Sequence, residues 1–237
     1  MPGRGEQTRQ LIIETALRMF RERGYAETTM RAIAGEAGVS VGNAYYYFDS
    51  KEHLVQEFYE RLQVEHRAAA EPVLRQESDF GPRLRGVLTA WLDVARPYHA
   101  FAAKFFTVAA EPSSPLSPFS AASSPSRQAA VGLLREVLEG STAKVDADLR
   151  AELPELLWLV ELGVVLHWVH DSSPAQARTR LLIDRAVPLV DRLVALSRLR
   201  VLRSVSRDVV SLSRALRGGT AEAPGPAEGS ADPDRRR

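Results

Sequence analysis

The chain has 237 residues, enough for one or two domains with a sizeable core, and its 31 basic and 30 acidic side chains nearly cancel. It contains no cysteine, which excludes disulfides, thiolate metal sites and cysteine nucleophiles. The first ten residues lack the apolar core of a signal peptide, and the longest apolar run, residues 153–169, is interrupted by Glu155 and Glu161. We therefore expect a soluble, cytoplasmic protein.

The first predicted helix spans residues 8–23, with an apolar face that includes Ile12 and Phe20 and with Gly24 at its end. A second helix follows, and Thr28 or Thr29 is expected to cap it because a side-chain oxygen can accept from an unpaired first-turn N–H. Gly38 is expected to end this helix, since glycine enters the left-handed conformation without a Cβ clash.

A third helix is predicted over residues 41–48, with Ser40 as its cap. It is too short and too polar for a core helix, and only Ala44 and Phe48 anchor it. Its opposite side carries the side chains of Val41, Asn43, Tyr46 and Tyr47, with Tyr45 beside them. A helix, a glycine turn and a short polar and aromatic helix are the layout of a DNA-reading helix-turn-helix.

The remainder of the chain also has helical periodicity, so the predicted fold class is all-α. Further helices are expected from Ser50 to about residue 74 and over residues 80–95, 99–109, 127–138, 154–170, 173–199 and 201–217, with a short helical turn at 146–153. Pro154 is expected to begin a new helix, and Pro188 to kink one. Residues 111–126, rich in serine and proline, are expected to form a surface loop, plausibly mobile, and residues 218–237 a disordered tail.

The motif resembles that of the TetR family of bacterial transcriptional regulators. The positions that carry the resemblance are Ala34-x-x-Ala37-Gly38-Val39-Ser40-x-Gly42-Asn43-x-Tyr45-x-Tyr47-Phe48-x-Ser50-Lys51-Glu52-x-Leu54. With the preceding helix, the similar segment covers about residues 8–60. The resemblance implies a three-helix helix-turn-helix DNA-binding domain at residues 1–50 and a helical ligand-binding and dimerisation domain at residues 51–217.

The resemblance also implies roles for residues of the head. Tyr47 and Lys51 match the family's phosphate clamp, and Thr29 and Ser40 can add neutral hydrogen bonds to phosphate oxygens. Gly42 lets the helix approach the groove. The residues expected to face the bases are Val41, Asn43, Tyr45 and Tyr46, of which Asn43 suits adenine and Val41 a thymine methyl. Val41 departs from the lysine or arginine of many relatives, and Ala44 from a larger aliphatic residue.

In the family, the second half encloses a pocket for a small molecule. The candidate ligand-binding residues are Trp91, Phe101, Phe105, Phe106, Trp158, His167 and Trp168, whose character suits a hydrophobic or aromatic effector. An ordinary core is the alternative for any one of them. His167 and His170 share a helix face, but no third ligand has suitable spacing, so we predict no metal site. Without a catalytic motif, we predict neither an enzyme nor a cofactor.

Surplus apolar surface on the helices at 154–170 and 173–199 predicts pairing of two copies in a four-helix bundle, although both helices could instead fill the monomer core. The arginine-rich face of residues 198–217 is interpreted as a solvated surface rather than as an additional DNA or membrane contact. We expect a homodimeric repressor that binds a palindromic operator and is released by a small molecule. The alternatives are a regulator or activator whose second half is only a dimerisation scaffold, and a helical carrier or enzyme with a vestigial head.

Overall fold

The computed structural model describes residues 3–197 and Ser211, and every regular element in that part of the chain is a helix. The α-helices are α1 (Arg4–Arg23), α2 (Met30–Glu36), α3 (Val41–Tyr47), α4 (Lys51–Gln76), α5 (Phe80–Ala95), α6 (His99–Ala110), α7 (Ser124–Glu139), α8 (Ala147–Val169) and α9 (Ala177–Leu196). Two short 3-10 helices, η1 (Arg96–Tyr98) and η2 (Pro174–Gln176), precede α6 and α9. The all-α prediction is confirmed. The predicted helix at 201–217 and tail at 218–237 lie outside the described residues, Ser211 excepted.

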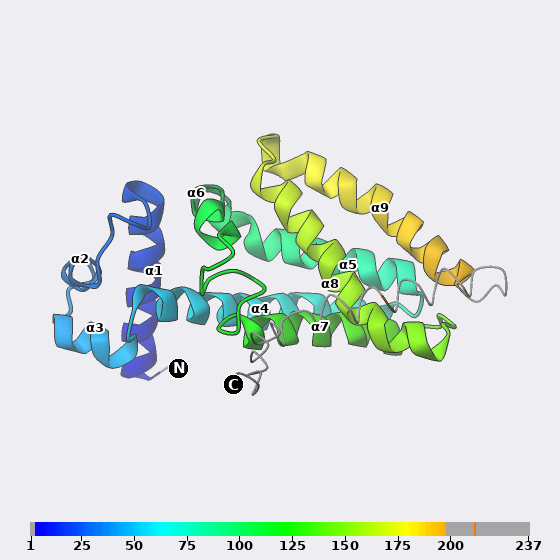
Figure 1. The fold of residues 1–237 in the computed structure, drawn as a ribbon, viewed down its shortest axis with the longest axis horizontal. Coiled ribbons are helices and arrows are strands. Elements are labelled where there is room, and N and C mark those ends of the chain that lie inside the picture. Colours follow the sequence, from blue (N-terminus) through cyan, green and yellow to red (C-terminus); the bar gives the residue numbers. More distant parts are fainter. Residues whose placement is uncertain (1–2, 198–210, 212–237) are drawn as a thin grey trace, which may run out of the picture.

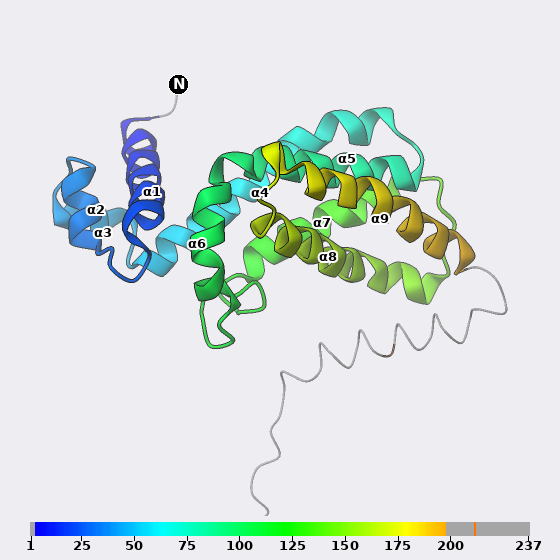
Figure 2. The same ribbon diagram turned by 90° about the horizontal axis from the view of Figure 1, so that it is seen from above.

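The helices form a small head and a larger body (Figure 1). Helices α1 to α3 make the head at one end, and α4 runs from the head along the whole body, which α5 to α9 complete. Seen from above, α6 lies at the junction of the two parts (Figure 2). Among the helices of the described residues, none combines the length and the apolar character that a membrane-spanning segment needs.

The head has its own apolar core, which we call the head core. Its buried residues are Ile12, Ile13, Ala16, Leu17, Met19, Phe20, Met30, Ile33, Ala34, Ala44, Phe48, Leu54, Val55, Phe58, Phe101, Phe105 and Leu116. This core therefore continues past residue 50 into the first turns of α4, and it takes in two residues of α6 and one of the segment that follows it. The body is thus packed directly against the head, and the boundary at residue 50 stays a prediction.

Arg83 joins the ends of three body helices. Its guanidinium is nearly buried and donates to the carbonyl oxygens of Leu74 (2.6 Å) and Glu77 (2.7 Å) at the end of α4, and of Glu136 (2.8 Å) and Val137 (3.0 Å) near the end of α7. The last carbonyl groups of a helix have no partner within the helix, so these bonds satisfy groups that would otherwise be costly to bury.

Helix α1 begins at Arg4 and not at residue 8, and α7 begins at Ser124 and not at residue 127. Two further predicted helix boundaries in the body are wrong. The structure has one continuous helix, α8, through Pro154, where we expected a break between a short turn and a new helix. The proline removes one backbone hydrogen bond, but Leu149, Leu153 and Leu157 are buried on both sides of it, and their burial offsets that loss.

The second wrong boundary lies before α9, which begins at Ala177 and not at Ser173. The buried carboxylate of Asp171 accepts hydrogen bonds from the backbone N–H groups of Ser173 (2.9 Å) and Thr179 (2.8 Å). These bonds hold the segment between them in a tight turn, in which Ala175 and Gln176 have positive φ angles of 53° and 52°.

Candidate nucleic-acid interface and ligand pocket

The caps of the head helices hold α3 in a fixed orientation. Thr29 Oγ1 accepts from the backbone N–H of Ala32 (3.2 Å), whereas the Thr28 hydroxyl donates to the carbonyl of Gly24 (2.8 Å), so Thr29 is the cap. Gly38 has a φ of +68°, which confirms the expected left-handed turn between α2 and α3. Ser40 Oγ then accepts from the N–H of Asn43 at 3.1 Å and begins α3.

Helix α3 presents a polar and aromatic face to solvent. Ala44 and Phe48 are fully buried in the head core, whereas Val41, Gly42, Asn43 and Tyr45 are exposed. Tyr46 is 81% exposed, and its ring meets that of the half-buried Tyr47 edge-on at 5.1 Å. Helices α2 and α3 lie at the outer end of the head, away from the body (Figure 1). An exposed face on a short anchored helix is the geometry that a groove-reading helix requires.

Gly42 stands out because the fold does not require a glycine there. A Cβ added at this position would meet no other atom within 4 Å, and the residue is helical. Glycine inside a helix costs about 1 kcal/mol relative to alanine. Because packing within the protein does not explain the glycine, we interpret Gly42 as a position where the backbone of α3 approaches another molecule closely.

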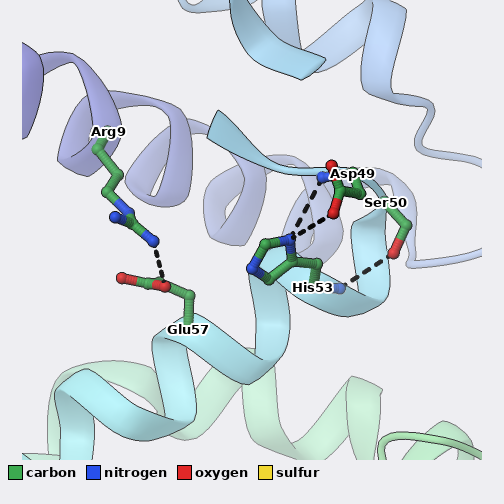
Figure 3. Close-up of polar contacts among 5 residues, drawn as sticks. All are labelled: Arg9, Asp49, Ser50, His53 and Glu57. Atoms are coloured by element: carbon green, nitrogen blue, oxygen red, sulfur yellow. Dashed lines mark hydrogen bonds and ion pairs between the residues drawn. The ribbon is translucent and has the colours of Figure 1, made fainter. Parts of the chain in front are cut away.

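The start of α4 is fastened to α1 and to its own preceding turn (Figure 3). Ser50 Oγ accepts from the N–H of His53 at 3.1 Å, which confirms Ser50 as the cap. His53 Nδ1 accepts from the N–H of Asp49 at 3.3 Å and lies 3.7 Å from its carboxylate. Arg9 of α1 pairs with Glu57 of α4 at 2.5 Å. The head therefore moves with the first turns of α4.

Lys51 is held beside Tyr25. Its ammonium donates to the Tyr25 carbonyl at 2.7 Å and lies 4.4 Å from the centre of the tyrosine ring, while the Tyr25 hydroxyl donates to Glu52 at 2.5 Å. Burial, followed by that hydrogen bond, raises the pKa of Tyr25, so this ring stays neutral. An ammonium has three donors, and this arrangement positions the group at the helix start with donors left for another acceptor.

Arg31 is a head residue that the sequence interpretation missed. It is exposed in the first turn of α2, two residues after the cap Thr29. A cation at this place can add to phosphate binding, because the N-terminus of a helix also favours anions. The signal available in the sequence was a charged residue between Met30 and Ile33, which point into the head core.

The body contains a cavity of about 410 Å³ bounded by α4 to α8 and by the segment between α6 and α7. Three of the seven residues predicted for a ligand pocket line it: Trp91, Phe106 and Trp158. Helix α4 adds Tyr59, Leu62 and Gln63 to the lining. Most of these side chains are apolar or aromatic, a character that suits a largely apolar ligand.

The other four predicted pocket residues lie elsewhere. Phe101 and Phe105 belong to the head core, where their rings stack at 4.9 Å and Phe105 meets Tyr25 edge-on at 5.4 Å. Trp168 is buried edge-on against Trp91 at 5.1 Å, behind the cavity wall.

His167 is exposed, with its Nδ1 3.0 Å from the Thr179 hydroxyl oxygen, and it lines a separate surface cavity near the turn between α8 and α9. The neighbouring His170 is also exposed, and its Nδ1 donates to the carbonyl of Leu166 at 2.9 Å. Neither histidine lines the cavity that holds Trp91 and Trp158.

The serine- and proline-rich segment forms one wall of the cavity, where we expected only a surface loop. Successive turns order residues 111–123, and the segment contributes Leu116 and Phe119 to the lining. Phe119 meets Trp158 edge-on at 5.4 Å, and Leu116 is 1% exposed. Gln56 of α4 donates to the carbonyl of Pro115 at 2.7 Å. Leu116 belongs to the head core as well, so one side chain touches both the cavity and the head.

These features define the class of protein: a helix-turn-helix DNA-binding regulator with a helical body. Comparison with known families agrees at both ends of the chain. Residues 12–58 match the model described as bacterial regulatory proteins of the tetR family, and residues 83–212 match the tetracyclin repressor-like C-terminal domain. The chain belongs to the TetR family of transcriptional regulators, which are not enzymes.

Similar curated proteins match mainly through the head. The transcriptional regulator TtgR of Pseudomonas putida is 44% identical over 61 residues, which are 26% of this chain and 29% of TtgR. The repressor KstR2 of Mycobacterium tuberculosis is 32% identical over 98 residues, 41% of this chain and 49% of KstR2. The chain thus spans less than a third of the length of the first and about half of the second.

Solved structures share the fold across the body as well. A TetR regulator from Nitrosomonas europaea has a TM-score of 0.60 at 17% identity and covers 76% of this chain and 96% of its own. The fatty acid degradation regulator FadR from Bacillus halodurans has a TM-score of 0.60 at 19% identity, with 84% and 98% covered. FadR from Bacillus subtilis, solved with stearoyl-CoA, has a TM-score of 0.59 at 16% identity, with 75% and 97% covered.

Proposed function

We propose that the protein is a homodimeric, cytoplasmic repressor that binds a palindromic DNA operator and is released from it by a small hydrophobic or aromatic effector. The observation that carries the DNA-binding part is the exposed face of α3, on which Val41, Asn43, Tyr45 and Tyr46 reach solvent while Ala44 and Phe48 anchor the helix. Exposing two neighbouring tyrosine rings to water is unfavourable, and an exposed patch of this kind is typical of a binding surface.

The homodimer is supported by exposed apolar side chains on α8 and α9. Leu159 and Leu166 of α8 are 41% and 49% exposed, and Leu189 and Leu193 of α9 are 58% and 67% exposed. Several exposed leucines on neighbouring helices form an apolar surface that is unfavourable in water and is typical of a protein–protein interface. A second copy of the chain can bury this surface by pairing it with its own about a two-fold axis. Two heads are also what a palindromic operator requires, since each head reads one half-site.

The effector is supported by the cavity and by its connection to the head. The cavity volume of about 410 Å³ suits a small molecule, and Leu116 joins its wall to the head core. A ligand that displaces Leu116 or Phe119 would shift the contacts between the segment 111–123 and the start of α4. Such a ligand changes the equilibrium between head positions only if it binds one position more tightly.

The names of similar proteins agree with this kind of function. KstR2 is named a repressor, and the Bacillus subtilis FadR structure holds stearoyl-CoA. We infer a repressor from these names and an apolar effector from the lining of the cavity. A regulator or activator without an effector, with the body only as a dimerisation scaffold, is the competing function.

The DNA-binding proposal is tested by enriching binding sequences from a random duplex pool and measuring affinity by fluorescence anisotropy at several salt concentrations. Lys51→Ala should weaken binding to all sequences and reduce the salt slope by about 1, whereas Asn43→Ala should mainly change sequence preference. Lys144→Ala, which removes an exposed cation from the body, is the control. Unchanged affinity and slope for Lys51→Ala would show that its phosphate role is wrong.

The effector is tested separately by a thermal-shift screen of small hydrophobic compounds, followed by the anisotropy assay. A compound that raises Tm should also release the DNA. Compounds that raise Tm and leave DNA binding intact would favour the competing function, as would a screen in which no compound binds.

A further inference from the structure

Three buried polar atoms that have no hydrogen-bond partner within the described part of the chain meet between α4 and α8. They are both carboxylate oxygens of Glu161 and Nδ1 of His66, with Oε1 of Glu161 3.9 Å from that nitrogen. Glu161 is 4% exposed and His66 1% exposed. A buried carboxylate that receives no hydrogen bond costs several kcal/mol, so such a group is uncommon unless it serves binding or catalysis.

His66 cannot satisfy the carboxylate as a neutral ring. Its Nε2 lies 3.0 Å from the carbonyl oxygen of Val87, which can only accept, so Nε2 carries the proton. Nδ1 is then an acceptor that faces another acceptor. Burial lowers the pKa of His66, which disfavours the second proton that would make it a cation. The carboxylate therefore lacks both a donor and a positive charge.

The pair lies beside the cavity that we propose as the effector site. On α8, Glu161 stands three residues after Trp158 and four before Val165, and both of those line the cavity. Residues at these spacings are neighbours on a helix surface. On α4, His66 follows the lining residue Gln63 by three positions and so continues the same helix face. The residue that carries this carboxylate is therefore a direct neighbour of lining residues on α8, and His66 is a direct neighbour of a lining residue on α4.

We propose that the effector is an apolar or aromatic molecule carrying a single protonated amine, and that the carboxylate of Glu161 receives this amine. The inference rests on the proposed function, since it assigns the ligand class of the same cavity. The aromatic lining holds the apolar body of the ligand, and the rings of Trp91 and Trp158 also attract a cation through their faces.

An acidic effector is the obvious competitor, because Arg127 also lines the cavity. Its guanidinium, however, already donates to the carbonyl of Pro118 at 3.1 Å and lies 5.9 Å from the centre of the Trp158 ring. Arg127 is half-buried and has partners, whereas Glu161 is buried and its oxygens accept no hydrogen bond. The larger gain from a ligand group is therefore at Glu161.

The test uses three probes with one skeleton: 4-phenylbutylamine, 4-phenylbutan-1-ol and 4-phenylbutanoate. Binding to the full-length chain is followed by quenching of tryptophan fluorescence, because Trp91 and Trp158 line the cavity, and by calorimetry. The wild type should bind the amine at least about tenfold more tightly than the alcohol, which corresponds to one charge-assisted hydrogen bond, and the acid most weakly. Glu161→Gln should bind amine and alcohol within about threefold of each other, because the amide has no charge.

Glu155→Gln is the matched control: Glu155 is half-buried on the same helix but does not line the cavity, so the preference for the amine should persist. If Glu161→Gln still binds the alcohol, its cavity is intact. If that variant misfolds, the affinities of the wild type for the amine, the alcohol and the acid still test the amine assignment. Equal binding of amine and alcohol, tighter binding of the acid, or a preference that survives Glu161→Gln would overturn the amine assignment while leaving an effector cavity. If no probe binds, the amine assignment fails, and the thermal-shift screen then decides whether the cavity takes another effector or none.

Discussion

Replacing Glu161 by Gln should change the pH dependence of stability in a defined direction. Burial raises the pKa of Glu161 from its ordinary 4.5 to about 7. Between these two values the folded protein keeps a proton that the unfolded chain has released, so the stability of the wild type falls as the pH rises. Gln has a similar size and no ionisable group, and the variant therefore lacks this loss.

The size of the effect follows from the two pKa values. A rise from 4.5 to about 7 corresponds to about 3 kcal/mol of unfolding free energy, at 1.36 kcal/mol for each pKa unit. The variant should resemble the wild type near pH 5 and exceed it by up to this amount near pH 8. His66 acts in the opposite direction, since its lowered pKa makes stability fall as the pH drops below 6.5, but it is present in both proteins and cancels in the difference.

The assay is urea unfolding followed by far-ultraviolet circular dichroism at pH 5, 6, 7 and 8, at one protein concentration because a dimer's stability depends on it. Glu155→Gln on the same helix serves as the control and should track the wild type. A difference between Glu161→Gln and the wild type that stays constant from pH 5 to pH 8 would refute the reasoning, because it would mean that Glu161 does not titrate in this range.

Three further variants test the head, the body and the dimer. Gly42→Ala should leave Tm unchanged or higher in a thermal melt, because the added Cβ meets nothing, yet weaken DNA binding at least about tenfold in the anisotropy assay; unchanged affinity would contradict close approach. Arg83→Met should lower the unfolding free energy in urea by about 3 kcal/mol, since the carbonyl groups of Leu74, Glu77 and Val137 lose this donor while that of Glu136 keeps the N–H of Gly140. A loss under about 1 kcal/mol would show that these carbonyl groups find other partners. Leu189→Glu combined with Leu193→Glu should halve the mass measured by light scattering; a variant that stays dimeric would place the interface elsewhere.

The head could be predicted largely from the sequence, because its structural signals are local. Thr29, Ser40 and Ser50 each cap a helix by accepting from the N–H three residues further on, and Gly38 supplies its own left-handed turn. Each of these interactions spans at most three residues, so it can be recognised without knowing how the rest of the chain folds. The apolar anchors of α3 are four residues apart and follow the same logic.

Which aromatic residues meet in the cavity depends on long-range packing and could not be predicted. Phe105 and Phe106 are adjacent in sequence, yet successive residues of a helix point in different directions, so the first enters the head core and the second lines the cavity. The residue type and the position along α6 do not show which part of the protein each of the two phenylalanines will contact. The same holds for Leu116, whose serine- and proline-rich surroundings suggested a loop in solvent.

The proximity of Glu161 and His66 could not be predicted from the sequence either. In the sequence, Glu161 interrupts an apolar run, and His66 is one of many polar residues on α4. Their meeting depends on the crossing of two helices far apart in the chain, which is set by the packing of all the side chains between them and not by any local signal. Local signals in the sequence therefore indicated the caps of α2, α3 and α4 and the side chains that α3 exposes, whereas long-range packing created the cavity and placed the buried carboxylate of Glu161 beside it.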